Sequence, residues 1–169
     1  MIPGFRILLI LCFSLFWGGL TFYTGFVVRI SHDVLEDPMD GGLITQRVTN
    51  LLQYLGGVTV GLMFLNGWQV RKQALLNQDS LLKRYAISLT TINLILAASV
   101  CGLFFVHHQL DSVIDVSNYE ITDRAQFVKS HRSYNQLTTV EWLSSIASIS
   151  ISLLAWRRMD LRKSKIELT

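Results

Sequence analysis

The sequence predicts an all-α integral membrane protein, built as a bundle of four antiparallel transmembrane helices with both termini in the cytoplasm. Three observations lead to this fold class. Of the 169 residues, 50% are hydrophobic and only 16% are charged, whereas about 25% of a typical soluble domain is charged. Four apolar stretches reach the length of about 20 residues that crosses a bilayer. Lysine and arginine residues gather in alternate connections between these stretches.

The four apolar stretches belong to a single domain over residues 1–169, because no segment between them is long enough to form a separate soluble domain. They cover about 7–28, 48–70, 86–106 and 134–156. Together they use about half of the chain. The lipid bilayer is therefore the first partner that the sequence predicts.

The distribution of positive charge predicts the topology. Ten of the 15 Lys and Arg residues lie at the N-terminus, in segment 71–84 or after residue 156, and five lie in or beside the two other connections. An excess of Lys and Arg in short loops marks the cytoplasmic side, so both termini and segment 71–84 are predicted to be cytoplasmic. This topology explains the basic character of the chain, and no nucleic-acid partner is expected. The short loops and the charge bias favour a plasma (inner) membrane.

The first stretch has Arg6 ahead of an apolar run, as a secretory signal peptide does, but we expect it to be retained. The run continues to Arg29, beyond the core of about 7 to 15 residues of a usual signal peptide, and no Ala-x-Ala-like site follows it. Gly18, Thr21 and Gly25 share one face of the predicted helix. Small residues of this kind let two helices approach closely in a bilayer.

The second stretch is expected to begin near Ile44, after an acidic connection with turn residues. One face carries, at helical spacing, Gln46, Asn50, Gln53, Gly57 and Gly61. Gly57 and Gly61 form a small-xxx-small pair, which is typical of a helix–helix contact in membranes.

The third stretch carries a weakly polar face, and connections are expected on both sides of it. The face consists of Thr90, Asn93, Ala97 and Cys101. Segment 71–84 is interpreted as a basic amphipathic loop near the anionic inner leaflet. Segment 107–133 is interpreted as the longest outer connection, with a short surface helix over residues 110–116.

The fourth stretch combines small polar residues with the only carboxylate that lies within a predicted span. One face carries, at alternating steps of four and three, Tyr134, Thr138, Glu141, Ser145, Ser148 and Ser152. Glu141 lies about two turns into the span, roughly 10 Å from its start. An ionisable side chain at such a depth is a functional candidate, because burying it in a membrane is costly.

We therefore predict a polar intramembrane site near the outer surface. Its candidate residues are Glu141, Arg47, Asn50, Gln53, Tyr134 and Thr138. Arg47 is a candidate partner for Glu141, because a carboxylate in this setting needs a positive neighbour or a proton. In this hypothesis Glu141 binds a cation or relays a proton. The alternative is that Glu141 fixes the register of two helices through a hydrogen bond or an ion pair.

The histidines suggest a different interpretation, because all four lie on the predicted outer side. They are His32, His107, His108 and His131. Imidazole is a common ligand for transition metals and haem iron. A metal- or haem-binding redox or resistance protein is therefore the alternative function. No His-x-x-x-His or His-x-x-Glu-His pairing is present, and none of the four lies in the middle of a span.

Two motifs resemble the uncharacterised four-helix membrane family that includes transmembrane protein 205. They are Gly25-Phe26, late in the first stretch, and Tyr134-Asn135-Gln136-Leu137-Thr138, at the start of the fourth. In topology the similarity extends over nearly the whole chain. Where the family has a His-Gly-Leu-Ser type opening, this chain has residues 135–138 and a histidine displaced to His131. The resemblance implies a four-helix membrane fold and supplies no activity.

The sequence favours a membrane protein without enzymatic activity, because it contains no paired nucleophile and base, no phosphate-binding loop and no CxxC motif. Such a protein would handle a cation or a small polar solute, or serve as a subunit of a larger assembly with its own copies or a membrane partner. A purely structural bundle, in which the polar faces serve only packing, is the third interpretation.

Overall fold

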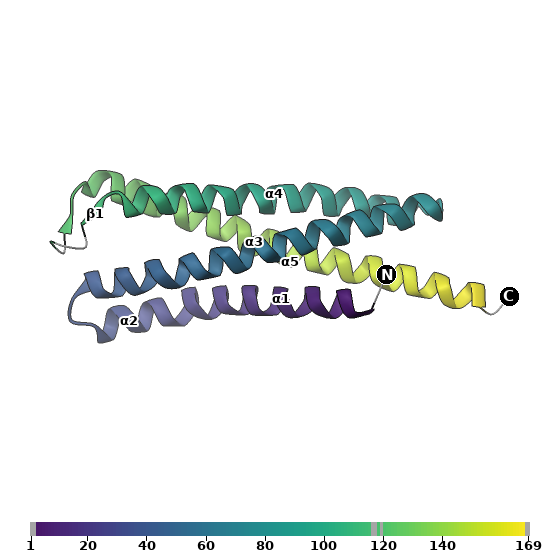
Figure 1. The fold of residues 1–169 in the computed structure, drawn as a ribbon, viewed down its shortest axis with the longest axis horizontal. Coiled ribbons are helices and arrows are strands. Elements are labelled where there is room, and N and C mark those ends of the chain that lie inside the picture. The colour runs from purple at the N-terminus through teal and green to yellow at the C-terminus, as the bar shows by residue number, and fades with distance from the viewer. Residues whose placement is uncertain (1–2, 116–117, 119, 168–169) are drawn as a thin grey trace.

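The computed structural model describes residues 3–115, 118 and 120–167. It consists almost entirely of helices, with one short antiparallel pair of strands (Figure 1). The elements in chain order are α1 (Pro3–Phe22), the π-helix η1 (Tyr23–Val27), α2 (Val28–Val34), α3 (Pro38–Leu76), α4 (Ser80–Asp111), β1 (Ile114–Asp115), β2 (Glu120–Ile121) and α5 (Arg124–Glu167).

Within the described residues, four helical segments are long and apolar enough to cross a membrane. They are Pro3–Ser31, Met39–Leu76, Ser80–Asp111 and Arg124–Arg162. Each contains one of the apolar stretches found in the sequence, so the prediction of an all-α bundle with four helices of spanning length is confirmed. The four apolar helices fit a multi-pass integral membrane protein.

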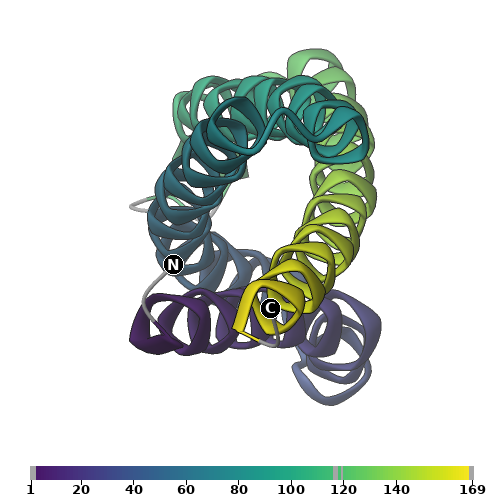
Figure 2. The ribbon, with the colours of Figure 1, turned by 90° about the vertical axis from the view of Figure 1, so that its right-hand side faces the viewer.

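Neighbouring long helices run antiparallel, in the up-and-down order of a four-helix bundle (Figure 1). Figure 2 shows them around a common axis in the order α1, α3, α4 and α5. The α3–α4 turn, the first residues of α1 and the last residues of α5 lie at one end of the bundle, which we call the basic end. The α2–α3 connection and the two strands lie at the opposite end, which we call the acidic end.

The connections between the helices are shorter than the sequence suggested. Helix α3 begins at Pro38, before the expected start near Ile44, because Asp37 accepts a hydrogen bond from Met39 N and proline is favourable in the first helical turn. Helix α3 likewise continues to Leu76 and α4 begins at Ser80, so the connection predicted over segment 71–84 is confined to residues 77–79. The helices have 39 and 32 residues, and at about 1.5 Å per residue both exceed a hydrocarbon core of about 30 Å.

The predicted surface helix over residues 110–116 is wrong. Helix α4 continues to Asp111, and strand β1 then pairs antiparallel with β2, with Ile114 opposite Ile121 and Asp115 opposite Glu120.

The apolar core lies in the half of the bundle next to the basic end. All four long helices contribute to it, through residues such as Leu9, Met63, Leu89 and Trp156. In the other half, the buried side chains of α3 and α5 include several polar ones, among them Thr49, Gln53, Ser130 and Glu141. Buried polar side chains therefore occur in both halves of the bundle, and Asn66, Asn93, Ser148 and Ser152 lie among the apolar core residues toward the basic end.

The face that α5 turns inward agrees with the sequence, because Glu141, Ser145, Ser148 and Ser152 are all buried. The prediction for α4 holds only in part. Asn93 is buried, whereas Thr90 and Cys101 are exposed.

The predicted small-residue contacts fall on the wrong member of two Gly-Gly pairs. Gly57 has no neighbouring atom within 4 Å of where a Cβ would stand, whereas Gly56 faces Phe16 and Glu141. Gly18 is equally open, whereas Gly19 faces Leu52 at 3.0 Å. Gly61 and Gly25, the other members of the predicted contacts, are open as well. Successive residues of a helix differ by about 100° in direction, so one residue of error turns the face away from its neighbour.

Candidate functional site

Glu141 lies near the middle of the bundle, where α1, α3 and α5 meet. Only 2% of the surface of Glu141 is exposed. The carboxylate of this α5 residue rests against Gly56 of α3, where a Cβ would stand 3.3 Å from Glu141 Oε1 and 2.9 Å from Phe16 Cε2. Glycine is therefore the residue that leaves room for the carboxylate between the two helices.

Four buried polar atoms around this position lack a hydrogen-bond partner in the described structure. They are Glu141 Oε1, Gln53 Oε1, His107 Nε2 and Trp17 Nε1. Buried polar groups are nearly always paired in folded proteins, because an unpaired group loses its hydration without compensation. An unpaired carboxylate oxygen and an unpaired amide oxygen on facing helices form an arrangement suited to a positively charged or hydrogen-bond-donating ligand.

Gln53 and Tyr134 connect α3 to α5 beside Glu141. The Gln53 side-chain amide donates a hydrogen bond to the Tyr134 hydroxyl at 3.1 Å. Tyr134 also interacts with the Thr49 side chain and with the charge of Glu141. Thr49 and Gln53 are one helical turn apart on α3, so they present their side chains on the same face.

The π-helix η1 contributes Tyr23 to the same region. Tyr23 is buried, whereas the following Thr24, Gly25 and Phe26 are exposed. Its hydroxyl donates a hydrogen bond to Thr45 Oγ1 at 3.1 Å, which joins η1 to α3. Short π-helical segments within α-helices occur frequently at functional sites.

An aromatic pair closes the site on the side of α1. The rings of Trp17 and Trp142 stack with centroids 5.4 Å apart. Trp142 Nε1 donates a hydrogen bond to Thr21 Oγ1 at 2.9 Å. Since Trp142 follows Glu141 directly in the chain, this contact fixes the part of α5 that carries the carboxylate.

His107 and Asp111 lie between the site and the acidic end. His107 is 8% exposed, and its Nε2 lies 3.7 Å from Asp111 Oδ1. The rings of His107 and Tyr134 have centroids 6.3 Å apart. Asp111, whose side chain is 39% exposed, also accepts a hydrogen bond from the side chain of Gln46 at 2.5 Å. Polar side chains thus continue from Tyr134 to the surface of the acidic end.

The structure brings together some of the candidate residues and leaves others apart. Glu141, Gln53 and Tyr134 share one region. Arg47 is exposed, and no ion pair joins it to Glu141 in the described part of the chain, so the structure does not support that pairing. Asn50 and Thr138 are half-buried, and the Thr138 hydroxyl donates to the backbone oxygen of Tyr134.

Thr49, Tyr23 and His107 belong to the site although sequence reasoning did not group them with Glu141. Thr49 could have been found, because positions 49, 53 and 56 share a face of a helix. The contribution of Tyr23 depends on η1, and that of His107 on how α4 packs against α5. Neither follows from a local sequence pattern.

The four histidines do not meet in the described structure. His107 is buried, whereas His108 and His131 are exposed, and His131 stacks on Phe127 with ring centroids 5.8 Å apart. The side chain of His32, in α2, lies outside the described part. Among the described residues, no group of three or more His, Cys, Asp or Glu side chains is placed to hold a metal ion. The metal or haem hypothesis stays a prediction.

Two buried asparagines toward the basic end, Asn66 and Asn93, have a hydrogen-bond partner on both the nitrogen and the oxygen of the side-chain amide. Asn93 donates to the backbone oxygen of Met63 at 2.9 Å and accepts from Ser148 at 2.6 Å. Asn66 donates to Ser152 at 2.8 Å and accepts from Trp156 Nε1 at 2.8 Å. These contacts join α5 to both of the central helices and give each amide one donor and one acceptor contact, as expected of structural residues.

Asp79 was not singled out in the sequence, yet it organises the basic end. Its carboxylate accepts hydrogen bonds from Leu81 N and Leu82 N at the start of α4. Arg158 and Arg162 of α5 donate to it at 3.1 and 3.2 Å. Burial opposes ionisation of Asp79, but these hydrogen bonds and the charge of Arg158 outweigh it and hold the pKa of the carboxyl below its usual value. An aspartate immediately before a helix is the signal that could have identified this cap.

The fold and its polar interior thus define a class, the multi-pass four-helix membrane proteins. Comparison of the chain with protein-family models, with curated proteins and with solved structures found no match. The resemblance to the family of transmembrane protein 205 therefore stays a prediction.

Proposed function

We propose that this chain is an integral membrane protein that binds a small cation at Glu141, with access from the acidic end. The observation that carries the proposal is the buried carboxylate oxygen that has no hydrogen-bond partner and no cationic neighbour in the described structure. The orientation is part of the proposal. The basic end faces the cytoplasm of a plasma membrane, as the excess of Lys and Arg indicates.

The chemistry of the surrounding groups favours a cation of low charge. Glu141 and Gln53 offer carboxylate and amide oxygens, and Tyr134 adds a hydroxyl. Oxygen ligands suit hard cations. A single carboxylate balances one positive charge, so an alkali cation or a proton fits better than a multivalent ion. Among the other titratable groups of this region, Tyr134 lies near the Glu141 carboxylate, and Tyr23 and His107 lie near Tyr134.

A metal cation and a proton would compete for the same oxygen atoms. A carboxylate inside a membrane needs either a counter-charge or a proton. Binding of a metal cation to Glu141 would therefore release a proton, as it does at other sites where ligands must be deprotonated. The affinity for the cation is accordingly expected to rise with pH.

Proton release on cation binding tests the proposal directly. Sodium, potassium, lithium or choline chloride is added to the protein in a weakly buffered detergent solution that contains a pH-sensitive dye. We expect at least one of the alkali ions to release up to about one proton per chain, because a single carboxylate is discharged. Choline, which is too large for the site, serves as the ionic-strength control.

Two matched variants assign the released proton to a residue. Glu141→Gln keeps the size of the side chain but cannot ionise, and it should abolish the release. Glu36→Gln removes a carboxyl from an exposed position between α2 and α3 and should leave the release unchanged. The proposal fails if no alkali ion releases protons from the unmodified protein, or if Glu141→Gln responds as the unmodified protein does.

A role as an assembly subunit, with copies of itself or with a membrane partner, is a separate proposal. Its test is the oligomeric state in mild detergent, which does not depend on the cation experiment.

A further inference from the structure

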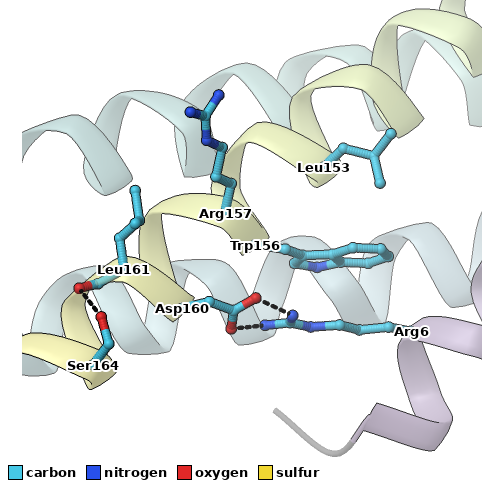
Figure 3. A pocket seen from close by; sticks show the side chains of 7 residues that line it. All are labelled: Arg6, Leu153, Trp156, Arg157, Asp160, Leu161 and Ser164. Carbon is cyan, nitrogen blue, oxygen red and sulfur yellow. Dashed lines mark hydrogen bonds and ion pairs between the residues drawn. The ribbon is translucent and has the colours of Figure 1, made fainter. Parts of the chain in front are cut away.

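A groove of about 530 Å³ lies at the basic end, on the outer surface of α5 beside the start of α1 (Figure 3). It is separate from the Glu141 region, which lies in the other half of the bundle. Its lining combines three apolar side chains with three charged ones, Leu153, Trp156, Leu161, Arg6, Arg157 and Asp160.

One wall of the groove is a rigid contact between α1 and α5. Arg6 donates two hydrogen bonds to the Asp160 carboxylate, at 2.6 and 2.8 Å. Its guanidinium also lies 5.3 Å from the centroid of the Trp156 ring. A two-point contact between arginine and a carboxylate is geometrically specific. It therefore holds the indole at a fixed place in the groove.

Arg157 supplies a positive charge that no described residue neutralises. It is exposed and takes part in no ion pair or hydrogen bond within the described chain. The neighbouring Arg158 and Arg162 differ, because both are paired with Asp79. With Arg6 and Asp160 compensating one another, the lining carries a net positive charge that belongs to Arg157.

The groove lies where the apolar part of α5 changes to its basic part. Leu153 is 48% exposed on the apolar side, and Arg157 follows one helical turn later, about 6 Å along the axis. Trp156 lies between them and is only 4% exposed, with its Nε1 bonded to Asn66, so the indole forms the buried floor of the groove. Along α5, an apolar surface is followed by the indole and then by the unpaired guanidinium. This order matches that of the acyl chain, the glycerol and the phosphate in a phospholipid.

We propose that this groove binds an anionic phospholipid, with its phosphate at Arg157 and an acyl chain along Leu153 and Trp156. Arginine is well suited to phosphate, because its planar guanidinium presents several donors at once. Basic pockets at the ends of membrane helices are suitable sites for anionic headgroups.

Lipid binding by purified protein tests this proposal. Native mass spectrometry counts the lipids that remain bound after detergent removal, with phosphatidylglycerol as the anionic probe and phosphatidylcholine as the neutral one. We expect Arg157→Ala to weaken phosphatidylglycerol binding about fivefold, the effect of losing one Lys or Arg at an anionic surface. Arg157→Lys should retain most of the binding.

Arg71→Ala is the matched control, because Arg71 is an exposed arginine of the same end that does not line the groove. It removes the same charge and should change binding less than twofold, since charge alone acts weakly beyond a Debye length of about 8 Å. Equal losses in the two variants, or equal binding of the two lipids, would overturn the proposal. So would inorganic phosphate displacing the lipid at equal concentration, because it lacks the acyl chain that the apolar lining is proposed to hold.

Discussion

Helix α5 carries buried polar side chains in both halves of the bundle, but the two groups are paired very differently. Toward the basic end, Ser148 and Ser152 bond to Asn93 and Asn66, and both amides have a donor and an acceptor contact. Toward the acidic end, Glu141 and Gln53 each keep an oxygen without a hydrogen-bond partner in the described structure.

This difference distinguishes two kinds of buried polar side chain within one helix, those with hydrogen-bond partners and those with an unpaired oxygen. Paired amides in an apolar environment fix the register of the helices, and nothing remains for a ligand to bind. An unpaired carboxylate destabilises the fold unless something else compensates it. The predictions below test whether the two groups behave differently, from the largest expected effect to the smallest.

The largest loss of stability is expected from Asn66→Ala. The substitution removes the partner of Trp156 Nε1 and of Ser152 Oγ and leaves a small cavity. We expect the free energy of unfolding in mild detergent to fall by about 2–3 kcal/mol. Asn50→Ala, a half-buried position of the same helix, is the control and should change it by less than about 0.5 kcal/mol. Equal effects would show that the Asn66 contacts contribute no particular stability.

Gly56→Ala is expected to reduce stability less than Asn66→Ala does, and to weaken cation binding at Glu141. The added methyl group would stand 2.9 Å from Phe16 and 3.3 Å from the Glu141 carboxylate. Overpacking of this kind costs about 1–2 kcal/mol. Gly57→Ala meets no atom within 4 Å, and it should stabilise the protein, because alanine favours a helix by up to about 1 kcal/mol over glycine. Thermal unfolding of both variants measures the difference. If both substitutions shift the unfolding temperature in the same direction, the assignment of Gly56 as the glycine that faces Phe16 and Glu141 is contradicted.

The Asp79 contacts predict a dependence of stability on pH. The pKa of Asp79 is lowered from 3.8 in the folded protein. Its contribution is therefore complete above pH 3.8 and is lost as the pH falls through the lower, folded value. Asp79→Asn should reduce stability by about 1 kcal/mol at neutral pH, since its arginine partners are partly exposed.

The difference between Asp79→Asn and the unmodified protein should disappear in acid. Asp37→Asn at the start of α3 is the control, because no arginine or lysine pairs with Asp37 among the described residues. If Asp79→Asn lowers the stability by the same amount at pH 7 and at pH 2.5, the proposed contribution of the Asp79 charge is contradicted.

The sequence was informative wherever a property extends over a whole helix. Hydropathy over about 20 residues located the four helices that are long and apolar enough to cross a membrane, and the spacing of the serines oriented α5 correctly. The sequence did not resolve features that depend on a single residue step along a helix. Hydropathy cannot show which glycine of Gly56-Gly57 faces a neighbour, and the face assigned to α3 was consequently turned toward Asn50 and Gly57. Arg47 was placed in the predicted site as a positive partner for Glu141, but it is exposed.

Contacts between distant elements were also beyond the sequence. His107 and Tyr23 reach the site only through the packing of α4 and η1, and Asp79 meets Arg158 only because α5 extends past the apolar span. By contrast, Gln53, Tyr134 and Glu141 were predictable as a group, because polar residues within apolar helices tend to face each other.

The most direct test of the central claim compares the unfolding temperature of the unmodified protein and Glu141→Gln, with and without the alkali cation that releases protons. If Glu141 serves binding, Glu141→Gln should be as stable as the unmodified protein without cation, within about 0.5 kcal/mol, because no hydrogen bond or ion pair is lost. Cation should stabilise only the unmodified protein, by about 2.7 kcal/mol at a hundredfold excess over Kd. A Glu141→Gln variant that is as unstable as Asn66→Ala, or that cation stabilises equally, would show that Glu141 is a structural residue.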